Sequence, residues 1–438
     1  MKRVHALLIT LALCTVGFLP LAVHGQSDTA LERRSAEISK AVHFDKTPKP
    51  LRDMFDTGET PKKVRGGRDF EPGKPDKVKD EIQNFEDPLA ARSVGATSAL
   101  ADPKASVIGT AVDPLLRVAP PDTTGDIGPN HYVQWVNLRY SIYTVTRGLN
   151  NEITGFNIVP GFPKQGNVVW QGFGGRCQTD NDGDPIVQYD QLADRWILTQ
   201  FAVSAQPFTQ CVAVSTTPDP TGTYFRYAFS YDRDFNDYPK MGVWPDAYYI
   251  TYNMFRNGSR YVGNRVCALE RAQMLVGGPA RQACVSTSTS HHSLEPADLE
   301  GTTLPPAGSP NLLLSITTSS LVFWRMAVNW TTGTGTLTGP ITVPGVAAFS
   351  RACGGGACIP QPGTATRLDS LADRLMYRLS YRRFATHESL VINHSVTAGT
   401  GVGIRWYELR NAAGQTLASA NPLVHQQGTF ASTNDFRW

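Results

Sequence analysis

The chain has 438 residues, of which 41 % are hydrophobic and 18 % charged, with a formal net charge of +3. That length allows one large repeat domain or two ordinary domains with an ample core. The charge pattern lacks the dense basic stripe of a nucleic-acid-binding surface, and 39 glycines with 30 prolines indicate many short strands joined by turns.

The N-terminus is typical of an export signal. Lys2 and Arg3 precede an apolar run from Ala6 to Val23, and a small residue, Gly25, stands at the expected cleavage position. A retained membrane anchor is the alternative, because the run is about long enough to span a bilayer. The polar sequence after Gly25 favours cleavage. We therefore expect residues 1–25 to be a signal peptide and the protein to be secreted, periplasmic or at the cell surface, with no membrane segment after cleavage.

Residues 26–103 are polar and rich in Lys, Arg, Asp, Glu and Pro. The proline-containing stretches Lys46–Pro50 and Glu71–Pro75 interrupt regular structure. We predict a disordered polar leader or linker here, with room for one short helix from Leu31 to His43.

From residue 104 onward, a β-hairpin pattern recurs. It is clearest at Asp184–Phe201, where a short apolar strand, a polar turn and a second strand of β-favouring residues follow one another. Each hairpin is followed by a third β-favouring run, and a fourth is visible at Tyr224–Ser230 and Thr338–Pro344. The five hairpins are Gly125–Asn137, Asp184–Phe201, Tyr238–Asn253, Ala297–Thr317 and Leu375–Val396.

Four strands in a repeating unit are typical of a β-propeller blade. The second strands of the hairpins start 52 to 77 residues apart, compared with about 40 to 50 residues for compact blades, and loop insertions account for the excess. A β-sandwich is the alternative, but its strands follow at about 8–12 residues without a longer period. Residues 104–438 are therefore predicted to be all-β, a β-propeller with five four-stranded blades visible.

Several motifs resemble a known group of proteins. They include PPDTTGD (Pro120–Asp126), DGDPIVQYDQLADRW (Asp182–Trp196), DYPKMGVWPDAYY (Asp237–Tyr249) and HESLVINHSV (His387–Val396). The stretch from about Pro120 to Trp438 resembles a family of secreted bacterial β-propeller proteins of sialidase-like or kelch-like architecture, most of them without an assigned activity.

Relatives in that family typically run on through further blades. The resemblance therefore implies that this chain is a C-terminally truncated member whose ring is incomplete. The alternative is that the segment around Val107–Val112 closes a five-bladed ring. An open ring leaves one face of the first blade and one face of the last blade uncovered. The residues expected on those faces are Ile127, Val133, Trp135, Trp406 and Leu409.

Six cysteines follow the signal, an even number in an exported protein. Six cysteines allow 15 connectivities, and the sequence does not decide among them. Our hypothesis pairs neighbours along the chain. A metal role is disfavoured because no CxxC pair and no His at ligand spacing accompany them. The pairs are Cys177–Cys211, Cys267–Cys284 and Cys353–Cys358.

Acidic residues recur where the chain enters the inner strands of the predicted blades. Carboxylates that converge on a wet channel mouth are the ligands that Ca²⁺ prefers. The alternating acids and glycine of residues 180–184 are typical of a calcium loop, although Gln191 stands where an EF-hand has its bidentate Glu. The favoured alternative is that these acids cap hairpin turns. The candidate metal ligands are Asp122, Asp126, Asp180, Asp182 and Asp184.

His387 and Glu388 are an adjacent base and acid, and together with Asp184 they are the candidate catalytic residues. Neighbouring strand residues point to opposite faces, which disfavours a joint role for His387 and Glu388. His291 and His292 lie in a Ser/Thr-rich segment that is more typical of a surface loop than of a metal site.

Sialidase activity is disfavoured. A sialidase needs an arginine cluster and a Tyr nucleophile with a Glu partner. Arg374, Arg382, Tyr377 and Tyr381 are available, but the Asp-box pattern Ser-x-Asp-x-Gly-x-x-Trp is absent from the sequence.

The leading functional hypothesis is a binding or scaffold module that recognises glycans or proteins at the cell surface. The alternative is a glycoside hydrolase or lyase with acidic residues at the propeller mouth. That alternative requires two carboxyl groups in one pocket, separated by about 5–5.5 Å or by about 6.5–9.5 Å.

Overall fold

The computed structural model describes residues 31–56, 85–90, 105–110, 120–361 and 363–431. The predicted signal peptide therefore lies outside the described residues. Within the described part of the chain, no helix is both long enough and apolar enough to cross a membrane. Residues 32–438 form one compact unit, and all the sheets below belong to it.

Within the described residues, five antiparallel sheets of four consecutive strands follow one another along the chain. The first contains β4 (Thr124–Ile127), β5 (His131–Val136), β6 (Arg139–Arg147) and β7 (Ile153–Ile158). The second contains β9 (Ile186–Asp190), β10 (Arg195–Ala202), β11 (Thr209–Ser215) and β12 (Tyr224–Ser230). The third contains β13 (Asp234–Val243), β14 (Tyr248–Arg256), β15 (Arg260–Leu269) and β16 (Arg281–Ser286).

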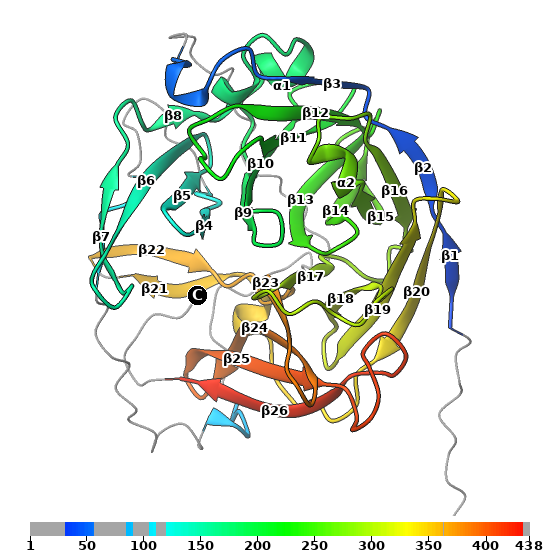
Figure 1. The fold of residues 1–438 in the computed structure, drawn as a ribbon. Coiled ribbons are helices and arrows are strands. Elements are labelled where there is room, and N and C mark those ends of the chain that lie inside the picture. The colour runs from blue at the N-terminus through cyan, green and yellow to red at the C-terminus, as the bar shows by residue number, and fades with distance from the viewer. Residues whose placement is uncertain (1–30, 57–84, 91–104, 111–119, 362, 432–438) are drawn as a thin grey trace, which may run out of the picture. The chain divides into compact units, whose positions relative to one another are not determined.

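The fourth sheet contains β17 (Glu295–Leu299), β18 (Asn311–Ile316), β19 (Leu321–Asn329) and β20 (Thr334–Thr342). The fifth contains β23 (Met376–Arg383), β24 (Glu388–Ala398), β25 (Gly401–Arg410) and β26 (Leu423–Phe430). A short parallel pairing of β17 with β23 joins these two sheets. The first strand of each sheet lies toward a common centre (Figure 1). The predicted β-propeller fold of four-stranded blades is confirmed, and each sheet is called a blade below.

Apolar side chains on both faces of the blades explain how the blades pack. Every position of β11 is buried, because a middle blade is covered on both sides. One buried cluster joins the first and second blades, a second joins the second and third, and a third extends from the third to the fifth. Among the described residues, no buried hydrophobic cluster joins the fifth blade to the first.

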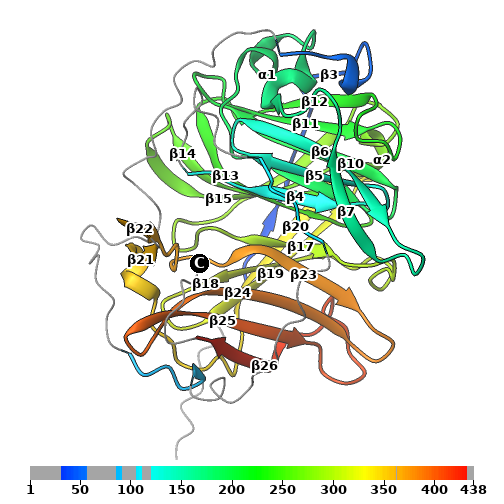
Figure 2. The same cartoon turned by 90° about the vertical axis from the view of Figure 1, so that its left-hand side faces the viewer.

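Three of the five residues expected on uncovered blade faces are fully buried. Val133 and Trp135 pack in the cluster between the first and second blades, and Leu409 packs with the fourth. The expectation was wrong for these three because their side chains point toward the neighbouring blade. Ile127 is 41 % exposed, and Trp406 is half-buried. Figure 2 shows the first blade (cyan) and the fifth blade (orange to red) from the side. The expectation that further blades follow stays a prediction.

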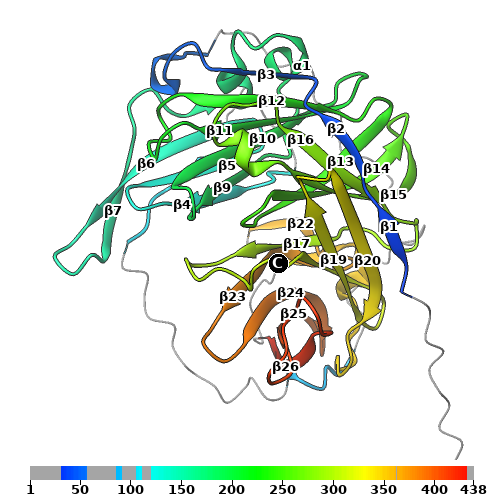
Figure 3. The same cartoon turned by 45° about the vertical axis from the view of Figure 1, so that its right-hand side comes forward.

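The prediction of a disordered leader is wrong for residues 33–46. They form β1 (Arg33–Ser35), β2 (Glu37–Lys40) and β3 (His43–Lys46), which pair with β20, β16 and β12 as the fifth strand of three blades. The short helix predicted here does not form. The outer strands of these blades offer a row of unpaired N–H and C=O groups, and a strand satisfies them where a helix would not. Figure 3 shows this segment (blue) along the outer edges.

Two ion pairs, one of them fully buried, hold the leader against the blades. Arg226, of which 1 % of the side chain is exposed, lies 2.6 Å from Asp45 of β3. Asp87 lies 2.7 Å from Arg405 of β25, and both side chains are fully buried. A 3₁₀ helix, η1 (Leu51–Asp53), also buries Leu51. The described parts of the leader are therefore held by charge pairs as well as by strand pairing.

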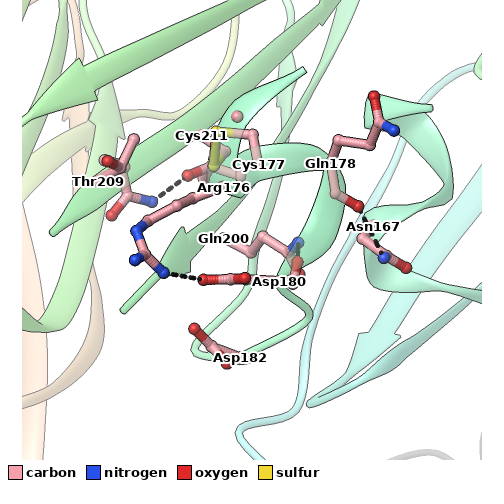
Figure 4. The surroundings of a disulfide bond; sticks show 12 residues. Asn167, Arg176, Cys177, Gln178, Asp180, Asp182, Gln200, Thr209 and Cys211 are labelled. Carbon is pink, nitrogen blue, oxygen red and sulfur yellow. Dashed lines mark hydrogen bonds and ion pairs between the residues drawn. A yellow bond between two sulfur atoms is a disulfide. The ribbon is translucent and has the colours of Figure 1, made fainter. Parts of the chain in front are cut away.

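The remaining elements lie in connections between the blade strands. They are β8 (Lys164–Gln165), η3 (Gly166–Trp170), α1 (Gly175–Thr179), α2 (Arg271–Met274), η4 (Ala352–Gly355), β21 (Ala357–Gln361) and β22 (Thr364–Asp369). Of these, β8 pairs with β6 of the first blade. All three predicted disulfides are confirmed. Cys177–Cys211 joins α1 to β11 (Figure 4), Cys267–Cys284 joins β15 to β16, and Cys353–Cys358 closes the loop around η4.

Arg378 of β23 connects the inner strands at the centre. Its guanidinium lies 3.0 Å from the Asp126 carboxylate and 3.4 Å from the Asp298 carboxylate. It also donates to the carbonyl oxygens of Gly125 and Val187, at 3.0 and 3.4 Å. These partners belong to β4, β9 and β17, so one side chain from the fifth blade contacts three other blades.

Its neighbour Tyr377 contacts the one remaining blade, the third. The Tyr377 hydroxyl donates to the carbonyl oxygen of Met241 in β13, at 3.1 Å. The inner strands of all five blades are therefore cross-linked by two adjacent residues of β23.

We predict that Arg378→Met lowers the free energy of unfolding by about 3–5 kcal/mol, because it leaves two largely buried carboxylates without their cation. Urea unfolding measures the change. Arg382→Met, an exposed position on the same strand, is the matched control. Equal stability of the two variants would contradict a central role for Arg378.

Candidate functional site

A residue with left-handed backbone conformation recurs just before three inner strands and at the irregularity within a fourth, β13. These residues are Asp122, Asp184, Tyr238 and Ser293, with φ of 42°, 42°, 53° and 51°. Two residues after each of them, strand pairing begins or resumes. The positions where it does so are, in the same order, Thr124, Ile186, Lys240 and Glu295. Such φ values are uncommon for residues other than glycine and persist only where the surrounding structure enforces them. The repeated turn gathers these strand starts at one end of the inner strands.

Five ionisable residues, one from each blade, meet at this end. Each alters the pKa of at least one other member, which places them within electrostatic range of one another. We call this set the axial cluster. Its members are Asp122, Asp184, Lys240, Glu295 and Arg374.

Asp122 and Asp184 form a carboxyl pair. A hydrogen bond joins them, and burial raises the pKa of Asp122 to about 6 and that of Asp184 well above its ordinary range. The side-chain amide of Asn137 donates to Asp122 at 2.6 Å and so favours its ionised form. A hydrogen bond between two carboxyls requires a proton on one of them. We assign that proton to Asp184, because the hydrogen bond between the two carboxyls raises the pKa of Asp184 and lowers the pKa of Asp122.

Lys240 lies beside this pair and beside Glu295. Lys240 as a whole is half-buried. Its ammonium group sits 3.6 Å from the centre of the Tyr238 ring and donates to the carbonyl oxygen of Pro239 at 3.0 Å. Burial lowers the pKa of Lys240, while Glu295, Asp184 and Asp122 oppose that effect. Lys240 is thus the one member of the axial cluster that acts on all three carboxyl groups.

Glu295 is the most enclosed member. Its side chain is fully buried, and among the described residues neither carboxyl oxygen has a hydrogen-bond partner. Burial raises the pKa of Glu295 to about 8, against the opposing charges of Lys240 and Arg374. An acid in this position carries its proton at neutral pH.

Arg374 closes the set on the side of the fifth blade. Its guanidinium donates to both carboxylate oxygens of Asp373, at 3.0 and 2.8 Å, and both side chains are at most 4 % exposed. The same guanidinium lies 4.7 Å from the centre of the Tyr238 ring. Tyr238 is therefore flanked by two cations, Lys240 and Arg374.

The five predicted calcium ligands do not form one site. Asp126 pairs with Arg378, and Asp122 with Asp184 belongs to the axial cluster. Asp180 accepts from Arg176 at 3.1 Å (Figure 4). Asp182 accepts from the backbone N–H of Ser204 at 2.8 Å. The described residues contain no group of three or more His, Cys, Asp or Glu side chains suited to a metal ion. Asp182 also accepts from the backbone N–H of Val203, so it binds the chain just after β10 and not its own turn. Calcium binding by any of these acids stays a prediction.

The predicted catalytic candidates separate in the structure. Asp184 lies in the axial cluster. Glu388 follows the far end of β23, where it is 4 % exposed and accepts from the Tyr381 hydroxyl at 2.6 Å and from the Leu417 backbone N–H at 2.7 Å. His387 instead stacks on Phe384, with ring centres 4.7 Å apart. Glu388 therefore makes these hydrogen bonds within the fifth blade, and the expectation that His387 and Glu388 do not act together stays a prediction.

Sequence reasoning missed Lys240, Glu295 and Arg378. Glu295 lies just before the fourth hairpin pattern, between Leu294 and Pro296, where it resembles an ordinary loop residue. The signal that finds it is strand register, since Glu295 is the first paired residue of β17 and Lys240 is where the pairing of β13 resumes. No comparable pattern singles out Arg378.

Comparisons with known proteins assign the chain to no family. No family model and no curated protein matches the sequence. Among solved structures, a GH43_1 enzyme from Xanthomonas citri has 15 % identity and a TM-score of 0.30, over 67 % of this chain and 88 % of that chain. An endo-arabinanase of GH43 from Bacillus licheniformis has 11 % identity and a TM-score of 0.26, over 66 % and 93 %.

An exo-1,5-α-L-arabinanase from a bovine ruminal metagenomic library has 9 % identity and a TM-score of 0.29, over 70 % of this chain and 96 % of that chain. All three are distant likenesses. The chemistry of the axial cluster is therefore argued from its own residues. The resemblance to sialidase-like or kelch-like proteins, drawn from sequence motifs, stays a prediction.

We predict that the stability of the protein falls as the pH rises from 6 to 9, and falls less in a Glu295→Gln variant. The pKa of Glu295 rises from an ordinary 4.5 to about 8 on folding, so at pH 6 the folded state holds a proton that the unfolded state has already released. The stabilisation is fully present below the unfolded pKa and is lost as the pH rises through the folded pKa.

Urea unfolding at pH 6 and pH 9 measures the slope. Glu37→Gln, whose side chain is 74 % exposed, is the control and should follow the wild type. Parallel slopes for wild type and Glu295→Gln would show that Glu295 titrates normally.

Proposed function

We propose that this protein is a carbohydrate-active β-propeller, a glycoside hydrolase whose acid and base come from the axial cluster. Cleavage of a glycosidic bond needs one protonated carboxyl to protonate the leaving oxygen and one carboxylate to activate water or attack the sugar. The observation that carries the proposal is the divergence of pKa values within one site, with Glu295 near 8 and Asp122 near 6. Pairs of titratable groups whose pKa values are driven apart by their surroundings are typical of acid–base sites.

The roles follow from these protonation states. Glu295 keeps its proton at neutral pH and is the proton donor. Asp122 is ionised above about pH 6 and is the carboxylate, and Asp184 donates a hydrogen bond to it. Lys240 lies near all three groups, so its positive charge stabilises the carboxylate that Glu295 becomes after it gives up its proton.

The composition of the site favours this reaction over acyl or phosphoryl transfer. The sequence contains no GxSxG motif, no phosphate-binding P-loop and no zinc-protease motif. Glycosidic cleavage requires neither a serine or cysteine nucleophile nor a phosphate cradle. Half-buried Asp122, Asp184 and Tyr238 supply polar and aromatic groups that a sugar ring contacts.

A non-catalytic glycan-binding or scaffold module is the second candidate. The complete burial of Glu295 favours it, because the carboxyl must be uncovered before it reaches a glycosidic oxygen. Three disulfides are typical of exported proteins. In either role we propose that the protein acts outside the cytoplasm.

We predict that the purified protein releases reducing ends from at least one polysaccharide in a panel of plant and bacterial glycans. Glu295→Gln should lower kcat/KM by about 10²- to 10⁴-fold, the usual contribution of a general acid. Glu37→Gln should retain the wild-type rate. Binding to a glycan without hydrolysis, unchanged in Glu295→Gln, would favour the scaffold role instead.

For the active substrate, we predict a bell-shaped pH profile of kcat/KM with limbs near pH 6 and pH 8. The lower limb reports the carboxylate of the Asp122–Asp184 pair and the upper limb the proton of Glu295. Loss of the upper limb in Glu295→Gln would identify its source. A wild-type profile that is flat from pH 5 to pH 9 would contradict the assignment.

A further inference from the structure

The outer edge of the first blade is uncovered in the described part of the chain. The leader strands β1, β2 and β3 pair antiparallel with the outer strands of the fourth, third and second blades. The outer strand of the first blade, β7, pairs with β6 on one side and with no described strand on the other (Figure 1). The first blade therefore keeps an edge of the kind that the leader covers in three other blades.

The hydrogen-bond pattern identifies the backbone groups on the outer side of β7. The Val159 N–H, just after the strand, donates to the carbonyl oxygen of Ile142 in β6 at 2.8 Å. Bonded positions alternate with non-bonded positions along an antiparallel ladder. Asn157, two positions from Val159, therefore faces β6, whereas the N–H and C=O groups of Phe156 and Ile158 point away from it. A row of such groups is a template for a further strand.

A cavity of about 700 Å³ opens beside this edge, on the face of the blade that points away from the second blade. Trp135 and Tyr140 are paired on the face that packs against the second blade. Side chains alternate between faces along a strand, so Tyr143, three positions from Tyr140, lies on the opposite face. Tyr143 is paired with Ile158 of β7. Both residues line the cavity, and so does Phe156.

Residues 107–110 form another part of the cavity wall. Thr110 fixes this segment to the blade, because its backbone N–H donates to the side-chain oxygen of Gln134 at 2.8 Å and its hydroxyl lies 2.7 Å from the hydroxyl of Ser141. Two apolar residues of the wall are open to solvent, since Ile108 is 91 % exposed and Ile158 is 47 % exposed. Burial of such side chains by a partner is favourable, and exposed apolar groups that lie together indicate an interaction surface.

The edge carries no charge of its own. No residue of β7 is ionisable, and Arg139 of the cavity wall lies 3.0 Å from the Asp56 carboxylate. The leader strands, by contrast, bring charges that meet opposite charges on the blades, as Asp45 of β3 meets Arg226 at 2.6 Å. A charged strand would find no such partner on β7, so the strand that fits this edge is uncharged.

We propose that β7 binds an extended, uncharged segment of a partner protein as a fifth strand, with an apolar side chain of that segment in the adjoining cavity. In strand addition, main-chain hydrogen bonds provide the affinity and pockets for alternate side chains provide the specificity. The outer strand of the fifth blade, β26, also ends its sheet, but the cavity wall contains no residue of β26. The proposal does not depend on the axial cluster, which lies at the inner strands.

Selection from a phage-displayed library of random ten-residue peptides, against the full-length protein, tests this. We expect the enriched peptides to carry bulky apolar side chains at alternate positions and few charges. Titration calorimetry with a capped synthetic form of an enriched peptide then measures its affinity. Methylation of one alternate set of its backbone nitrogens should weaken binding at least about tenfold, because that set donates to β7, and methylation of the other set should not.

Two variants locate the site. Thr154→Pro removes an N–H that points away from β6, a change that an edge strand tolerates, and Ile158→Asp places a charge in the cavity. Each should weaken peptide binding at least about tenfold. Ile127→Asp is the matched control, because Ile127 is 41 % exposed on the same blade and does not line the cavity. Thermal melts check that each variant is folded, and either variant alone suffices.

Three results would overturn the proposal. The first is a selection that enriches no alternating apolar peptide, or binding that both variants leave unchanged. The second is binding that neither pattern of methylation weakens but that Ile158→Asp abolishes, which would assign the cavity to a ligand held by side chains alone. The third is dimerisation in analytical ultracentrifugation that Thr154→Pro abolishes and the peptides do not inhibit, which would assign the edge to a second copy of this chain.

Discussion

The contact on which the rest of the structure depends is the one that Arg378 makes at the centre of the five blades. A propeller brings the inner strands of separate sheets together, but these strands do not form ladders with one another, except for the short β17–β23 pairing. Arg378 instead binds Asp126, Asp298 and two backbone carbonyls across three blades. A buried charge destabilises the fold unless it is paired. Removing one partner of a buried pair destabilises the fold by more than the intact pair stabilises it. The central ion pairs therefore fix how the blades meet.

The same constraint shapes the site. With the inner strands held together at their middle, their starts converge at one end, and each start carries a polar or charged side chain. Asp122, Asp184, Lys240 and Glu295 come close to one another although more than 170 residues separate the first from the last. Burial there raises the pKa of every carboxyl in the set, and Lys240 limits that rise. A site that holds one proton-bearing acid and one carboxylate near neutral pH follows from this combination.

Much of the fold could be predicted from the sequence, but the site only in part. The hairpin at Asp184–Phe201 and the run Tyr224–Ser230 have strong alternating patterns, and the disulfides join neighbours along the chain. Asp122 and Asp184 were found because turn acids recur before inner strands. Residues 33–46 form strands because the outer strands of three blades have backbone groups that require hydrogen-bond partners. Local composition does not show such long-range pairing. Glu295 and Arg378 have meaning only once strand register and the meeting of blades are known.

The central claim is that Glu295 keeps its proton at neutral pH because the blades bury it beside Lys240. Infrared difference spectroscopy of the wild type and the Glu295→Gln variant, recorded as a pH titration, tests it most directly. The account predicts a protonated carboxyl band in the wild type that persists through pH 7, disappears near pH 8 and is absent from the variant. The account would be contradicted if the band that Glu295→Gln removes were already absent from the wild-type spectrum above pH 6.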